Sequence, residues 1–171
     1  VSTINPHKNY ETLIRAYAGL PPDAPPLLIA GKLLHAPTYA LLQQLVTQLR
    51  LQERVHFLGG VAYDKLPALY QGAVASVMPS RLETFGHPLV EAMAARTPVI
   101  ASDLPVCREI CEEAALYFAP DDAPALTAHL LVVWQDAGLR ARLATAGEQR
   151  ARQFSWSESA RRLVEVFEEL A

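Results

Sequence analysis

At 171 residues the chain has the length of one ordinary domain, and 51% hydrophobic residues are enough for a sizeable core. A net charge of −3 at pH 7 and a pI near 5.9, without a basic stripe, argue against a nucleic-acid partner. The sequence lacks a signal peptide and any apolar run of membrane-spanning length, which predicts a soluble, cytoplasmic protein. Because it opens on Val1-Ser2-Thr3-Ile4 without an initiator Met, we expect a piece of a longer protein.

Short apolar runs alternate with longer amphipathic ones along the chain. The apolar runs predict six strands, at residues 1–4, 27–30, 55–58, 73–78, 98–101 and 115–118. Helical spacing of apolar residues predicts helices at 10–20, 37–50, 64–71, 89–95, 106–112, 123–134 and 139–146, and a last helix capped by Ser155 with Glu158. Strands that are apolar on both faces indicate a parallel sheet covered by helices. The sequence therefore predicts an α/β, Rossmann-like three-layer domain over residues 1–171, with a mostly parallel sheet of about six strands.

The most informative stretch follows the fourth predicted strand. Glu83 and Glu91 stand eight residues apart around an expected helix start, with Gly86 and Pro88 between them. Pro88 suits the beginning of a helix, and Gly86 lets the backbone come close to a ligand. Free N–H groups at a helix start favour an anion, above all a phosphate. We expect Glu91 in the first helical turn and Glu83 in the loop, on either side of a phosphate that carries a polyhydroxylated group.

The cysteines and histidines show no metal-binding pattern. Cys107 and Cys111 lie four residues apart in a helical stretch, a spacing that suits neither a disulfide nor a complete zinc site. We interpret them as structural thiols in a reducing compartment. The scattered His35, His56 and His129 also lack ligand spacing. No metal and no cofactor are expected.

Several motifs resemble those of a known family. The run ETFGHPLVE from Glu83 to Glu91 is the most specific of them. The others are residues 6–9, 27–31, 55–59, 78–80, 92–94, 98–103 and 154–156. In this order they resemble the signatures of family 4 retaining glycosyltransferases. That resemblance implies a GT-B fold, in which two Rossmann-like domains face a cleft, and it implies that this chain is the carboxy-terminal, donor-binding domain without the amino-terminal acceptor domain.

The resemblance also implies roles for individual residues. The catalytic pair would be Glu83, which contacts the transferred sugar, and Lys8, which neutralises the diphosphate as the bond to the sugar breaks. Glu91 would accept hydrogen bonds from the ribose hydroxyls. Many members have an arginine shortly before the lysine, but Ser2, Thr3 and Ile4 occupy that region here. No covalent nucleophile is expected, because retention in this family is usually assigned to front-face attack with the leaving phosphate as base.

The remaining donor-binding residues come from the same resemblance. Backbone N–H groups from Gly86 to Leu89 would hold the diphosphate, with His87 exposed on that loop. The full expected donor-binding set is Glu91, Gly86, His87, Pro88, Leu89, Val90, Ser80, Val55, His56, Phe57 and Gly31. Residues 55–57 would border the base, and residues 89–90 would form the floor near it.

The implied function is transfer of a hexose, such as mannose or glucose, from a nucleoside diphosphate to a glycan, lipid or small-molecule acceptor. The isolated fragment should bind donor weakly and transfer nothing, because the acceptor half is missing. The alternative is a non-catalytic nucleotide-binding or scaffold module that kept the fold. A GT-B epimerase or phosphorylase is a third reading, but its histidines or lysine-bound cofactor cannot be placed here.

Two partner predictions concern the whole enzyme and the last helix. The expected partners are the nucleotide sugar and the acceptor domain that this chain lacks. The full-length enzyme is also expected to associate peripherally with a membrane. The last helix should carry an apolar face that includes Leu163, Val164, Phe167 and Leu170. Because an exposed apolar stripe tends to find a partner, we expect this face to fold onto its own domain or to pack against a second copy.

Overall fold

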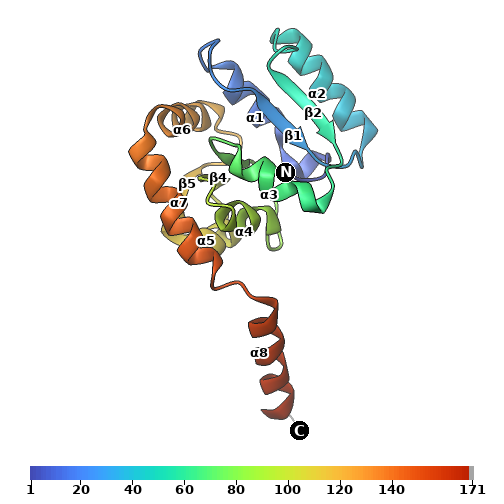
Figure 1. Ribbon diagram of the computed structural model, residues 1–171. Helices are drawn as coiled ribbons and strands as arrows, with labels where there is room; N and C mark the ends of the chain where they lie inside the picture. Colours follow the sequence, from blue (N-terminus) through green and yellow to red (C-terminus); the bar gives the residue numbers. More distant parts are fainter. Residues whose placement is uncertain (170–171) are drawn as a thin grey trace.

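Five parallel strands form two separate sheets in the computed structural model, which describes residues 1–169 (Figure 1). The first sheet pairs β1 (Leu27–Ala30) with β2 (Val55–Gly59). The second sheet has the order β3 (Ser76–Met78), β4 (Val99–Ser102) and β5 (Ala115–Phe118). All strand pairs are parallel and the connections run through helices, so the predicted α/β class is confirmed.

Helices alternate with these strands and close the chain. The main helices are α1 (Tyr10–Ala18), α2 (Ala36–Gln48), α3 (Leu66–Gln71), α4 (His87–Ala94), α5 (Pro105–Cys111), α6 (Ala123–Gln135), α7 (Ala137–Ala151) and α8 (Trp156–Glu169). Short 3-10 turns cover Pro6–Lys8, Tyr63–Lys65 and Glu112–Ala114. Every helix expected from the apolar spacing is present, with boundaries that shift by a few residues.

Strand β4 shows how the sheet lies between two helical layers. Ile100 packs in a core cluster with Leu126 of α6, whereas its neighbours Val99 and Ala101 pack in a second cluster with Met93 of α4. Alternate residues of a strand point to opposite faces. Both faces of this strand are therefore buried, as expected for a three-layer domain.

Residues 1–4 do not form the first of the predicted strands, so residues 1–169 contain five strands where about six are expected. The Ser2 N–H donates to the Ala30 carbonyl over 2.8 Å, and Ile4 forms a single parallel bridge with Leu33. These contacts lie at and beyond the end of β1, so no ladder develops along its length. The close approach depends on Gly31, because a Cβ there would lie 1.6 Å from the Ser2 carbonyl oxygen.

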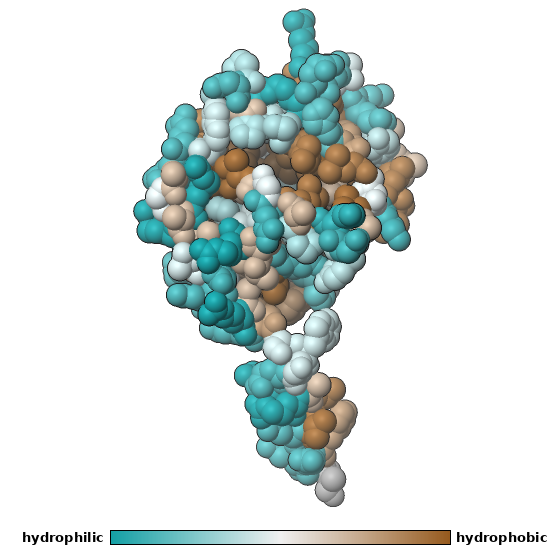
Figure 2. Space-filling view, viewed as in Figure 1, coloured by the Kyte–Doolittle hydropathy of each residue, from teal (hydrophilic) through white to brown (hydrophobic). Residues whose placement is uncertain are grey.

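Helix α8 projects away from the rest of the domain (Figure 1). On its apolar face Leu163, Val164 and Phe167 are 54–63% exposed. Figure 2 shows hydrophobic surface along one side of the projecting helix. Of the two expected outcomes, folding onto its own domain is not the one seen, because residues 152–155 lead the helix away from the core (Figure 1). Packing against a second copy stays a prediction, and Leu170 lies outside the described residues.

Two smaller predictions concern α8 and the cysteines. The Glu158 N–H donates to Ser155 Oγ over 3.4 Å, which confirms the expected cap at the start of α8. Cys107 and Cys111 are buried free thiols, consistent with a structural role. Within residues 1–169, no helix has both the length and the apolar composition needed to cross a membrane.

Candidate functional site

The loop between β3 and α4, residues 79–86, is called the motif loop and forms the centre of the candidate site. Gly86 precedes the first residue of α4 at φ +85°, a left-handed conformation that glycine adopts without strain. Pro88 follows in the first turn, where its missing N–H costs nothing. Since β3 and the loop meet at the carboxyl end of the sheet, the motif lies where parallel α/β sheets commonly bind ligands.

Glu83 joins this loop to the segment that carries Lys8. The Lys8 ammonium lies 2.6 Å from Glu83 Oε1, and the Ser80 hydroxyl donates to the same oxygen over 2.7 Å. The side chains of Lys8 and Glu83 are only 14% and 8% exposed. A carboxylate removed from water in this way depends on its charged and hydroxyl partners. The structure thus brings together three of the predicted site residues.

Glu91 is held by a residue that the sequence analysis did not single out. Its Oε2 accepts a 2.9 Å hydrogen bond from the Tyr70 hydroxyl. Burial, with a smaller contribution from Glu91, raises the pKa of Tyr70 well above its ordinary value, so the phenol stays a donor. Glu91 is the fifth residue of α4 and lies in the second turn. The expectation of the first turn is wrong because α4 begins at His87, one residue before Pro88, where the helix was expected to begin.

Few backbone amides at the start of α4 are available to an anion. Pro88 has no N–H, and the Leu89 N–H already donates to the Gly86 carbonyl over 2.8 Å. The amides of Gly86 and His87 are therefore the ones in this stretch that can meet a phosphate. Leu89 is buried, whereas Val90 is half-buried, and both belong to the core packing around α4.

His87 packs among aromatic rings. Its ring centroid lies 4.8 Å from that of Phe85 and 6.4 Å from that of Trp156, which it faces nearly parallel. Phe85 also meets Phe154 edge to face, with centroids 5.9 Å apart. The motif loop is thus in contact with the link between α7 and α8, a relationship that the sequence pattern did not predict.

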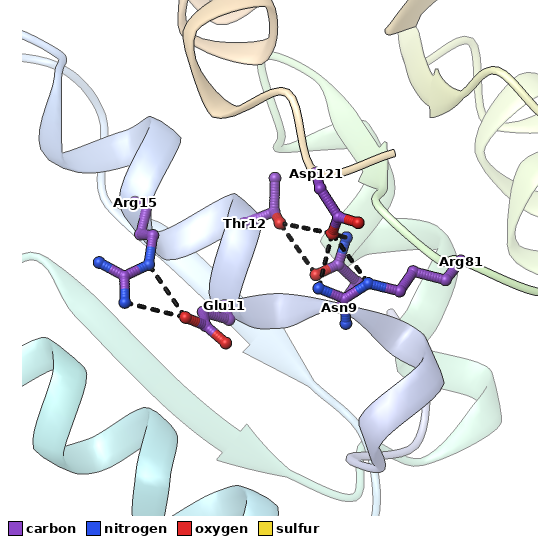
Figure 3. A network of polar contacts seen from close by, with 6 residues as sticks. All are labelled: Asn9, Glu11, Thr12, Arg15, Arg81 and Asp121. Carbon is purple, nitrogen blue, oxygen red and sulfur yellow. Dashed lines mark hydrogen bonds and ion pairs between the residues drawn. The ribbon is translucent and has the colours of Figure 1, made fainter. Parts of the chain in front are cut away.

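A polar network holds the Lys8 segment beside the motif loop (Figure 3). Arg81 donates to Asp121 through Nε over 2.8 Å, and Asn9 donates to the same carboxylate oxygen over 3.2 Å. The Arg81 backbone N–H also donates to the His7 carbonyl over 2.8 Å. Arg81 holds the pKa of Asp121 below its ordinary value. Sequence reasoning missed this network, since its members lie far apart in the chain and only the fold brings them together.

The predicted base-binding residues of β2 lie apart from this cluster. Val55 is buried in the core, and Phe57 packs edge-on against Tyr39 with ring centroids 5.1 Å apart. His56 is exposed. Gly31, at the end of β1, donates its N–H to the Gly59 carbonyl over 2.7 Å. The structure does not bring these side chains into contact with Lys8, Glu83 or Glu91.

The cluster combines a cation, helix-start amides and two carboxylates at one end of the sheet. The ammonium and the amides suit an anionic group, and the carboxylates suit hydroxyl donors. A ligand that carries a phosphate between two polyhydroxylated groups would satisfy all of them.

Comparison with known proteins gives relatives for this arrangement. The chain is 32% identical over 170 residues to O-antigen chain mannosyltransferase B of Escherichia coli, covering 98% of this chain and 44% of that protein. Anabaena Alr3699/HepE, solved in complex with UDP and glucose, superposes with a TM-score of 0.91 at 25% identity, over 98% of this chain and 47% of that one. The C-terminal domain of a group 1 glycosyl transferase (LpcC) from Francisella tularensis superposes with a TM-score of 0.80 at 24% identity, over 90% of this chain and 82% of that domain, and shows the shared fold.

The chain spans less than half the length of the curated relative and of HepE. Residues 1–150 match the family described as Glycosyl transferases group 1. This match includes Lys8, Ser80, Glu83 and Glu91. Together with the GT-B glycosyltransferases among its structural neighbours, it shows that the chain belongs to the group 1 glycosyl transferase family.

Proposed function

We propose that this chain is the donor-binding, carboxy-terminal half of a family 4 retaining glycosyltransferase. The contact between Lys8 and Glu83, beside the start of α4, carries the proposal. In this proposal the Lys8 ammonium binds a diphosphate, and the neighbouring Glu83 carboxylate accepts hydrogen bonds from sugar hydroxyls. The acceptor would be held by an amino-terminal domain outside this chain.

In the proposed reaction, the acceptor hydroxyl attacks the anomeric carbon of the hexose as its bond to the diphosphate breaks. The acceptor proton passes to the leaving phosphate on the same face, so the configuration is retained. Lys8 and the amides at the start of α4 stabilise the negative charge on the leaving group. Glu83 positions the sugar, and the step requires neither a covalent nucleophile nor a metal.

The ion pair suggests how the site changes when donor binds. A diphosphate would compete with Glu83 for the Lys8 ammonium, because both anions seek the same cation. Glu83 keeps the Ser80 hydroxyl as a partner and gains the hydroxyls of the sugar. Until the donor binds, the ion pair therefore gives each of these two poorly hydrated charges an oppositely charged partner.

Glu91 is proposed to bind the ribose. Tyr70 occupies Oε2, which leaves Oε1 to accept from a ribose hydroxyl. The relatives include a mannosyltransferase and a protein solved with UDP and glucose. They support a nucleotide-linked hexose as the donor. The proposed acceptor is a glycan, a lipid or a small molecule.

A thermal-unfolding panel with UDP, GDP and ADP tests donor binding. At ten times its Kd, a nucleotide stabilises the fold by about 1.4 kcal/mol, a Tm increase of about 3–6 °C for a domain of this size. We expect one nucleoside diphosphate to give this shift and its monophosphate to give less. The Lys8→Met variant should lose most of the difference between diphosphate and monophosphate.

No shift with any of the three diphosphates, or an equal shift in Lys8→Met, would contradict donor binding at this site. The second test is transfer itself. Residues 1–171 should show no turnover of a nucleotide sugar onto an acceptor, and the full-length protein should show it. Turnover by residues 1–171 alone contradicts the two-domain proposal, and binding without any transfer by the full-length protein favours the non-catalytic module.

A further inference from the structure

Aromatic rings connect the motif loop and the start of α4 to the link segment, residues 152–156, where α7 passes into α8 (Figure 1). Phe85 meets Phe154 edge to face, with ring centroids 5.9 Å apart. His87 faces Trp156, the first residue of α8, with ring centroids 6.4 Å apart and ring planes inclined by 20°. Two rings near the candidate phosphate site are therefore each in contact with a ring of the link segment.

The ring of Phe154 has a fixed position on the body of the domain. The guanidinium carbon of Arg150, on α7, lies 5.0 Å from the centroid of this ring, a cation–π contact. The same guanidinium donates to the carbonyls of Glu109 and Ile110 on α5, over 2.6 and 2.9 Å. The Arg150 side chain is only 16% exposed. Phe154 is therefore attached to both α5 and α7.

The two amides that are open to an anion benefit from this support. They are the amides of Gly86 and His87, and the second belongs to the peptide bond that follows Gly86. Glycine has the least restricted backbone of all residues, so it does not fix the orientation of that peptide bond by itself. Phe85 and His87 stand on either side of Gly86. Their contacts with the link segment therefore restrain the two peptide bonds between them.

Trp156 is the ring in this group that burial does not explain. It is 83% exposed, so it removes little apolar surface from water. The start of α8 has a cap of its own, because the Glu158 N–H donates to the Ser155 hydroxyl. The stacking on His87 is therefore the contact by which Trp156 can influence the phosphate-binding amides.

We infer that Phe154 and Trp156 are positioning residues for the anion site at the start of α4. Their rings hold Phe85 and His87, and thereby keep the amides of Gly86 and His87 in the orientation that binds a diphosphate. The inference rests on the proposed function, because that function makes the ligand a diphosphate. Binding and positioning are linked, so a bound diphosphate should in turn stabilise the stacking of Trp156 on His87.

The test titrates residues 1–171 with inorganic pyrophosphate and follows the NMR amide signals of Gly86 and His87. In the parent, both signals should shift and reach saturation. Trp156→Ala should weaken pyrophosphate binding by about 2- to 10-fold, the value of one aromatic pair. Trp156→Phe keeps a ring that can stack and should restore most of the affinity. Trp156→Leu keeps apolar volume without a ring and should bind as weakly as Trp156→Ala.

Phe154 is tested in the same way. Phe154→Leu fills much of the half-buried site but has no ring to meet Phe85. It should weaken pyrophosphate binding within the same range of about 2- to 10-fold. Phe154→Tyr keeps the ring and should bind as the parent does.

A double substitution shows whether Trp156 acts through His87. His87→Ala removes the stacking partner and leaves the backbone amide in place. In this background Trp156→Ala should cause no further loss of pyrophosphate affinity. The matched control is Phe167→Ala, at an aromatic side chain further along α8 that is 63% exposed. It should bind pyrophosphate as the parent does.

Equal pyrophosphate affinity in the parent and in either Trp156→Ala or Phe154→Leu would overturn the inference. An equal loss from Trp156→Ala in the His87→Ala background would overturn it as well, and so would full rescue by Trp156→Leu. If the Gly86 and His87 amides of the parent do not respond to pyrophosphate, the inference fails because the link segment then positions no anion site.

The proposed function fails by a different result. If pyrophosphate behaves as expected but no nucleoside diphosphate binds, the donor assignment is wrong and the positioning role stands. If a nucleoside diphosphate binds and the substitutions at Trp156 and Phe154 change nothing, the inference alone is wrong.

Discussion

The Lys8 ammonium lies 2.6 Å from the Glu83 carboxylate, although the two residues are 75 positions apart in the sequence. Removing the cation leaves a nearly buried carboxylate with only Ser80 as its partner. Lys8→Met should therefore lower the free energy of unfolding by about 1.5–3 kcal/mol, the value of a hydrogen bond to a charged group. Urea unfolding measures this loss. The matched control is Lys32→Met, an exposed lysine, which should change it by less than about 0.5 kcal/mol.

Tyr70 should act on nucleotide binding through Glu91. Tyr70→Phe removes the hydroxyl that donates to Glu91 Oε2 and leaves the ring in place. A net hydrogen bond of about 0.5–1.5 kcal/mol corresponds to a decrease in affinity of about 2- to 10-fold for a nucleoside diphosphate. Calorimetry on this variant measures the change, and Tyr63→Phe, at a side chain that is 79% exposed, should bind as the parent does. Equal affinities in all three proteins would show that Tyr70 does not position Glu91.

Gly86 combines a left-handed backbone with close packing. A Cβ there would meet Leu89 Cδ1 at 3.1 Å and the Met78 sulfur at 3.4 Å. Gly86→Ala should therefore destabilise the fold by about 1–3 kcal/mol through strain and crowding together. Gly59→Ala is the matched comparison, since Gly59 has a φ of +68° but open space around its Cβ position. Thermal unfolding should show a larger loss for Gly86→Ala, and a smaller one would mean that crowding at the helix start is unimportant.

Asp121 makes the network beside Lys8 sensitive to acid. Arg81 lowers the pKa of this carboxyl group below its ordinary value of 3.8, so the ionised form stabilises the folded state above that pH. This contribution is lost as the pH falls through the lower pKa of the folded state. Between pH 6 and pH 3, the Tm of the parent should therefore decrease more than the Tm of Asp121→Asn. Parallel Tm curves for the two proteins would assign the acid sensitivity to other groups.

Much of the fold could be predicted because periodicity is a local property. Buried strands such as Val99–Ser102 appear in the sequence as apolar runs, and amphipathic helices keep their spacing. The strand predicted at residues 1–4 is wrong because a segment becomes a strand only where it pairs along a neighbouring strand. Residues 1–4 meet only the end of β1 and the residues just beyond it. Glu91 lies one residue further into the helix than the sequence predicts, because helix boundaries depend on local cap geometry at Gly86.

The candidate site was predictable in its residues but not in its contacts. Lys8, Glu83 and Glu91 follow from a motif, yet nothing in the motif says that Lys8 contacts Glu83 without a ligand. Tyr70 and Asp121 belong to elements without any signature, and they reach the site only through the packing of α3 and the end of β5. Such tertiary contacts produce no periodic pattern of apolar residues by which a single sequence could predict them.

The central claim is that Glu91 binds the ribose and Glu83 binds the sugar of one donor. Calorimetry should compare Glu91→Ala and Glu83→Ala with the parent, each with a free nucleoside diphosphate and with the corresponding nucleotide sugar. A charge-assisted hydrogen bond of about 1.5–3 kcal/mol corresponds to about 10- to 100-fold in affinity. Glu91→Ala should weaken both ligands by this factor, whereas Glu83→Ala should weaken the nucleotide sugar and leave the free diphosphate nearly unchanged. If Glu91→Ala binds the free diphosphate as tightly as the parent, the assignment of Glu91 to the ribose is contradicted.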